Sequence, residues 1–176
     1  VGKTRMVIEA ARRMAELSSD ATDTAMMRYV NGVYFIPLAS LNRPELLPGA
    51  IANAIGFRFA AGADQRTQLI NYMCEKAMLL VVDSAYRALP TIGLLAEMLH
   101  AAPRLKILAT SRARLNLTGE TVYTLEGLSI EAHLPPERIA ESSAYKLFVS
   151  SARRAKPGFE PTEQDALGIA SIVQMV

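Results

Sequence analysis

The chain begins with residue types that suit a phosphate group, Gly2-Lys3-Thr4. They match the last three defined positions of the phosphate-binding motif G-x-x-x-x-G-K-[ST]. In that motif glycine lets backbone N–H groups face phosphate oxygens, lysine reaches the terminal phosphates and threonine offers its hydroxyl to Mg²⁺. A plain helix start with a solvated lysine is the alternative, because so short a match recurs by chance. The pattern predicts the end of a phosphate-binding loop whose leading glycine and strand are missing.

An acid at the end of an apolar run is the second chemical feature. Residues 78–82 are all apolar, and Asp83 follows them. A run without alternation is typical of a parallel strand buried on both faces. Because a buried carboxylate is costly without a role, we expect Asp83 to organise a metal ion, with capping of the turn as the alternative. A second buried strand is expected over residues 105–110, and Ser111-Arg112 follows it.

Helical and extended patterns alternate along the first part of the chain. A helix is expected from Lys3 to about Leu17, with Met6, Ala10, Met14 and Leu17 on its apolar face. Pro37 cannot donate a ladder hydrogen bond, so the strand 33–38 is expected at a sheet edge. Three further helices are expected: residues 44–55, a helix that begins at Asp64, and residues 91–100. The further strands expected are residues 78–83, 105–110 and 121–125.

Strands separated by helices predict a parallel α/β sheet, and ligands of such sheets lie beyond the carboxyl ends of the strands. Lys3, Thr4, Asp83, Ser111 and Arg112 are therefore expected to gather at that edge. After about residue 128 the pattern becomes helical, with an apolar stripe in 144–152 and a capping box at 162–165. We therefore predict an α/β domain over 1–128 and the start of a helical domain over 129–176.

Composition narrows the classes of partner. The net charge is +2 and there is no Trp, so direct contact of this segment with nucleic acid is not expected. Cys74 is the only cysteine, which excludes an internal disulfide and a cysteine zinc site. No apolar run is long enough to span a bilayer, and we expect no membrane contact and a cytoplasmic location.

Four segments together resemble a known family. They are Gly2-Lys3-Thr4-Arg5, residues 33–39, residues 79–83 and residues 105–112, and they look like the nucleotide-binding domain of STAND-class signalling ATPases, which includes NB-ARC domains. The resemblance implies a P-loop NTPase fold, a three-layer αβα sandwich with its first strand missing here, followed by a small helical domain. It also implies binding of ATP or ADP with Mg²⁺.

The resemblance also implies roles for single residues. Thr4 and Asp83 would hold Mg²⁺, and Arg112 would contact the terminal phosphate. Asp83 and Arg112 would be the catalytic residues. The other nucleotide contacts implied are Gly2, Lys3, Arg5 and Ser111. No second acid follows Asp83, so any ATP hydrolysis is expected to be slow.

Three functions remain open from the sequence. The favoured one is an ATP/ADP-binding switch in a multidomain signalling or transcription-regulating ATPase. Its partners would be the nucleotide, other domains of the same chain and, on activation, further copies of the protein. The alternatives are a catalytic NTPase or kinase with its own substrate, and a degenerate scaffold that binds no nucleotide.

Overall fold

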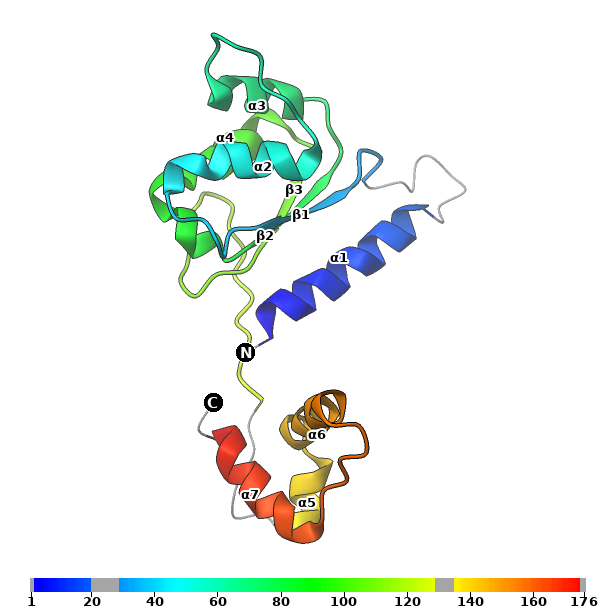
Figure 1. Ribbon diagram of the computed structural model, residues 1–176. Helices are drawn as coiled ribbons and strands as arrows, with labels where there is room; N and C mark the ends of the chain where they lie inside the picture. Colours follow the sequence, from blue (N-terminus) through cyan, green and yellow to red (C-terminus); the bar gives the residue numbers. More distant parts are fainter. Residues whose placement is uncertain (1, 20–28, 129–134, 175–176) are drawn as a thin grey trace. The chain divides into compact units, whose positions relative to one another are not determined.

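The computed structural model describes residues 2–19, 29–128 and 135–174. They form two compact units, Gly2–Tyr123 and Thr124–Val176 (Figure 1). Each unit has its own apolar core and is described separately. The predicted functional division at residue 128 stays a prediction.

A parallel sheet of three strands forms the centre of the first unit. Its strands are β1 (Val33–Pro37), β2 (Leu79–Asp83) and β3 (Lys106–Ala109), in the order β1-β2-β3. Val33 lies opposite Leu79, and Leu79 lies opposite Lys106. All five residues of β2 are buried, as the uninterrupted apolar run predicts. The predicted mixed α/β class with a parallel sheet is therefore confirmed.

Pro37 ends β1 opposite Asp83. Among the described strands β1 lies at the edge of the sheet, where a residue without an N–H costs no ladder hydrogen bond. The chain then stays attached to β2, because the N–H of Leu38 donates to the carbonyl of Asp83 at 3.0 Å. The predicted edge position of this strand is confirmed.

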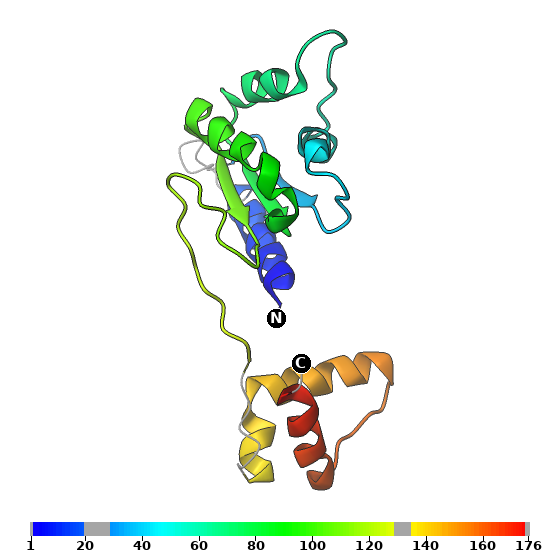
Figure 2. The same ribbon diagram turned by 90° about the vertical axis from the view of Figure 1, so that its left-hand side faces the viewer.

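Helices cover both faces of the sheet (Figures 1 and 2). Leu80 and Val82 point into a core shared with α2 (Leu47–Ile55), α3 (Gln65–Met73) and α4 (Gly93–Ala101). Leu79 and Val81 point to the other face and pack with Val7 of α1 (Lys3–Ser19). The alternation along β2 thus places consecutive side chains in two different cores.

The predicted helix ends follow from capping. Asp64 accepts a hydrogen bond from the N–H of Thr67 at 2.8 Å and starts α3. Gly56 takes the left-handed conformation, φ 71°, and ends α2. Two short 3₁₀ helices, η1 (Pro44–Leu46) and η2 (Ala85–Thr91), precede α2 and α4. The helix expected over 91–100 begins at Gly93, because Thr91 is the last residue of η2.

The apolar face expected for α1 is wrong. Met6 is 44% exposed and Leu17 is 69% exposed, whereas Val7 is 3% exposed against the sheet. The helix is apolar on more than one side, so spacing alone does not identify the side that packs. Contact with Leu79 and Val81 decides it, and it selects Val7 and the partly buried Ala11.

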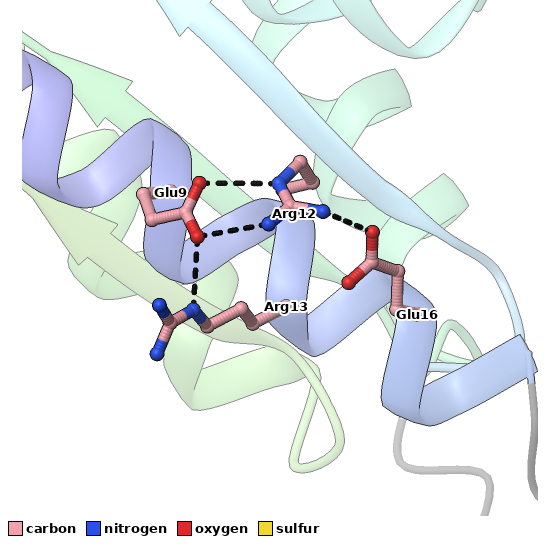
Figure 3. A network of polar contacts seen from close by, with 4 residues as sticks. All are labelled: Glu9, Arg12, Arg13 and Glu16. Atoms are coloured by element: carbon pink, nitrogen blue, oxygen red, sulfur yellow. Dashed lines mark hydrogen bonds and ion pairs between the residues drawn. The ribbon is translucent and has the colours of Figure 1, made fainter.

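The polar face of α1 holds a chain of ion pairs (Figure 3). Glu9 pairs with Arg12 and Arg13, each at 2.9 Å, and Arg12 also pairs with Glu16. Hydrogen bonds from Arg12 and Arg13 lower the pKa of Glu9 to about 2. Glu9 therefore keeps its charge throughout the neutral range, although the exposed position means that salt screens these pairs.

The strand expected over 121–125 is absent, and residues 121–128 have no regular secondary structure. Val122 and Tyr123 are residue types that favour strands, but Tyr123 is 81% exposed. A strand forms only by pairing, and this segment pairs with none of the described strands. It is instead where the two compact units divide.

The second unit consists of α5 (Pro136–Glu141), α6 (Ser143–Ala155) and α7 (Glu163–Gln174). Its core joins Ile139, Tyr145 and Ile169 from the three helices. The expected stripe on α6 is partly wrong, because Leu147 and Ser151 are exposed while Tyr145 and Val149 are buried. Half of the predicted capping box is present: Asp165 accepts the N–H of Thr162 at 2.8 Å, whereas the Thr162 hydroxyl donates to Asp165 and does not accept its N–H.

We predict that Val7→Ala lowers the free energy of unfolding by about 1.5 kcal/mol or more, because it removes two buried methyl groups. Met6→Ala, at an exposed neighbouring position, should change it by less than about 0.5 kcal/mol. Urea unfolding of the 176-residue chain measures both values. An equal or greater cost for Met6→Ala would contradict the packing described for α1.

Candidate functional site

The carboxylate of Asp83 is the centre of the candidate site. It ends β2, and the residue is 5% exposed. Its Oδ1 accepts a hydrogen bond from Thr4 Oγ1 at 2.7 Å and another from Thr110 Oγ1 at 2.6 Å. These hydrogen bonds replace part of the water that burial removes. One carboxylate oxygen thus joins the start of α1 to the carboxyl ends of β2 and β3.

Thr110 is the residue that the sequence analysis missed. Besides donating to Asp83, its Oγ1 accepts the N–H of Ser84 at 2.9 Å. The N–H of Thr110 donates a hydrogen bond to the carbonyl of Val82 at 2.9 Å, and its carbonyl accepts the N–H of Ala85 at 2.8 Å. The main chain of Thr110 is therefore bonded to residues on both sides of Asp83. The sequence pattern could have indicated this contact, because a hydroxyl residue follows one strand and an acid ends the neighbouring strand.

Ser84 takes a left-handed conformation, with φ 62° and ψ 39°. For a residue other than glycine such a conformation costs about 1–3 kcal/mol and requires support from its surroundings. The hydrogen bond to Thr110 provides that support, and the turn leads β2 directly into η2. Ser84 Oγ lies 3.5 Å from Asp83 Oδ2, the limit for a hydrogen bond, so this second oxygen has only a weak donor.

The start of α1 has the backbone that the motif predicts. Gly2 takes φ 95°, which favours glycine, and its carbonyl accepts the N–H of Met6 at 3.0 Å. Lys3 follows as the first residue of α1, is half-buried, and forms no ion pair with a described residue. Arg5 is exposed, and none of the hydrogen bonds to the Asp83 carboxylate comes from it. The structure therefore brings Thr4 to Asp83 but does not bring Arg5 there.

Ser111 and Arg112 follow Thr110 at the same edge of the sheet. Ser111 Oγ accepts the N–H of Ala113 at 3.2 Å, which makes it part of a local turn. Arg112 is exposed, and its guanidinium carbon lies 5.4 Å from the centre of the Tyr86 ring. Neither side chain contacts Asp83, so the described contacts of the site comprise Thr4, Asp83, Ser84 and Thr110.

The arrangement offers oxygen atoms only. Carboxylate and hydroxyl oxygens are the ligands that hard cations such as Mg²⁺ prefer. Within residues 2–19, 29–128 and 135–174, no group of three or more His, Cys, Asp or Glu side chains could hold a metal ion. A cation at Asp83 would therefore need oxygen ligands from water or from a bound molecule, which is usual for Mg²⁺.

The chain is similar to proteins named "Putative HTH-type transcriptional regulator" from Mycobacterium bovis and from two strains of Mycobacterium tuberculosis. Identity is 28% over 173 residues, which is 98% of this chain and 17% of each relative. The chain therefore spans about a sixth of the length of these relatives. No family model matches it, and no solved structure matches it. In the part of the chain that the structure describes, no helix is long and apolar enough to cross a membrane.

These relatives correct the family and the function inferred from the sequence. They are named as helix-turn-helix transcriptional regulators, so the assignment to STAND-class P-loop ATPases with an NB-ARC domain does not stand. The ATP/ADP-binding switch derived from that assignment is withdrawn with it. The physical reason for the error is that Gly2-Lys3-Thr4 and Asp83 describe a local arrangement, and a local arrangement does not determine the class of protein.

We predict that Thr110→Val lowers the free energy of unfolding by about 1–3 kcal/mol, because it leaves the N–H of Ser84 without its partner and removes one donor to Asp83. Thr4→Val is the matched control. It removes the other donor to the same oxygen, but Thr4 is exposed and water can replace its hydroxyl. Chemical unfolding measures both variants, and an equal or larger loss for Thr4→Val would contradict the role given to Thr110.

Proposed function

We propose that this chain is a regulatory segment of a DNA-binding transcriptional regulator. The observation that carries the proposal is the continuous similarity, over 98% of the chain, to proteins named as helix-turn-helix transcriptional regulators. Because the chain spans 17% of their length, regulation of transcription is proposed for the whole protein and not for this segment alone.

DNA contact is proposed to come from another part of that protein. Residues 124–176 contain five basic and seven acidic residues, a net charge of −2. Lys and Arg that neutralise DNA phosphates supply most of the non-specific affinity of a DNA-binding protein. An excess of acid in the helical unit opposes such binding, so this unit is a poor candidate for the DNA-reading helices.

The ligand of the Asp83 site is a separate part of the proposal. We infer that the site takes a divalent cation together with a phosphate-bearing compound. Thr4 and Asp83 would hold the cation, while Gly2, Lys3, Ser111 and Arg112 would face the phosphate. Thr4 can donate its proton to Asp83 and still offer an oxygen lone pair to a cation. ATP or ADP with Mg²⁺ is the ligand that we propose.

We also propose that the sheet belongs to a three-layer αβα sandwich. Helices cover both faces of the three-stranded sheet, which supports a complete three-layer αβα sandwich in the longer protein. In such sheets the carboxyl ends of the strands form the ligand-binding edge. Asp83 and Thr110 lie at that edge, which is why the ligand is proposed there and not at the helical unit.

We predict that the full-length protein containing this chain selects a specific sequence from random duplex DNA. Its affinity for the selected site should exceed its non-specific affinity by roughly 10³-fold or more at physiological salt. Transcription from a promoter carrying that site should change with Asp83→Asn and not with Glu75→Gln, an exposed acid outside the site. Failure to select any sequence would contradict the proposed DNA-binding regulator, and identical transcription with both variants would contradict the role of Asp83.

A further inference from the structure

Tyr86 lies close to two arginine side chains. The guanidinium carbon of Arg112 is 5.4 Å from the ring centre, and that of Arg87 is 5.5 Å from it. Arg87 Nε also donates a hydrogen bond to the Tyr86 hydroxyl at 3.2 Å. Arg87 is the next residue along η2, whereas Arg112 comes from the segment after β3. The ring is half-buried, so it is held by the fold while both guanidiniums remain exposed.

Neither arginine is neutralised by a carboxylate of a described residue. The ion pairs among the described residues involve other arginines, and the carboxylate of the nearby Glu120 accepts the N–H groups of Leu115 and Leu117. Two like charges at one ring repel each other, and the electron-rich face of the ring offsets only part of that repulsion. An oxyanion that contacts both guanidiniums would replace repulsion with two charge-assisted hydrogen-bond contacts.

The position of the pair connects it to the Asp83 site. Arg87 lies in the 3₁₀ helix that directly follows Asp83, and Arg112 lies two residues after Thr110, whose hydroxyl donates to Asp83. Both arginines therefore emerge from the same carboxyl edge of the sheet. Guanidinium groups match the geometry of carboxylate and of phosphate, which excludes a neutral polar molecule. The phosphate-bearing compound proposed for the adjacent Asp83 site selects a phosphoryl group between these two.

We propose that Tyr86 is a positioning residue that holds Arg87 and Arg112 as a paired receptor for one phosphoryl group. Arg87 is thereby a ligand-binding residue that lies outside the sequence motif. The inference rests on the proposed phosphate-bearing ligand. It adds that the guanidinium groups of Arg87 and Arg112 bind the phosphate without a metal ion. Because DNA contact is proposed for another part of the protein, the phosphoryl group belongs to a free compound, and a DNA backbone is the alternative that the experiment tests.

The absence of tryptophan from the chain makes a direct test feasible. Tyr86→Trp introduces a single indole at the platform and keeps an aromatic face for both guanidiniums, since indole is the best cation–π partner. Inorganic pyrophosphate, titrated into this variant in EDTA, should change the indole fluorescence in a saturable way. Adding Arg87→Gln should weaken the apparent affinity by roughly tenfold, and adding Arg58→Gln, an exposed arginine on another loop, should leave it unchanged.

A second series separates positioning from folding. Calorimetry in EDTA should show a smaller loss of pyrophosphate affinity in Tyr86→Phe, which lacks only the hydroxyl that accepts from Arg87, than in Tyr86→Leu. The leucine variant also lacks the ring face, and its affinity should fall by roughly two- to fivefold. Circular dichroism should show the same helix content in all variants. Duplex DNA added to the pyrophosphate complex at low salt is the second arm. It should leave pyrophosphate bound, and displacement would identify a DNA backbone as the source and contradict a free compound.

The control with metal distinguishes this inference from the proposed cation site. Pyrophosphate binding in EDTA that depends on Arg87 and Tyr86 supports the receptor, even if Mg²⁺ adds nothing and the cation site at Asp83 fails. Binding that requires Mg²⁺ and is unaffected by Arg87→Gln and Tyr86→Leu overturns the receptor while the cation site stands. No binding in either condition overturns both.

Discussion

The carboxylate of Asp83 is the constraint on which the first unit depends. It is buried at the carboxyl end of a strand, where a charge without partners is unfavourable by several kcal/mol. Thr4 and Thr110 supply its hydrogen bonds from two other elements, so α1 and the segment after β3 must both lie against the end of β2. The left-handed turn at Ser84 depends on the same arrangement, because the second hydrogen bond of Thr110 supports it. One buried acid therefore couples three elements of the fold to one site.

The sequence predicted those parts in which a single residue type allows one arrangement. The apolar run before Asp83 had to be a buried strand, and Pro37 is tolerated at the edge where β1 lies. The sequence did not predict which side of α1 packs, because apolar residues occur on several sides and the sheet selects Val7. Thr110 was missed since a threonine is common in strands and gains its role only from the neighbouring acid.

The correction of the family follows from the same distinction between local and global information. A glycine with φ 95°, a lysine, a threonine and a buried acid describe the chemistry of one edge of a sheet. They do not say which domains accompany that edge, and similar sites occur on proteins of different function. The likeness to helix-turn-helix regulators comes from the whole length of the chain and therefore carries more weight for the function of the longer protein.

Binding of a divalent cation tests whether Asp83 and Thr4 form one cation site that a phosphate ligand completes. Electron paramagnetic resonance of Mn²⁺ with the 176-residue chain measures free and bound ion directly, with and without pyrophosphate. We expect Mn²⁺ binding that pyrophosphate strengthens and that Mg²⁺ displaces. Asp83→Asn should abolish this binding, and Glu75→Gln should not. Equal Mn²⁺ binding by the Asp83→Asn variant and the unsubstituted chain would contradict this cation site.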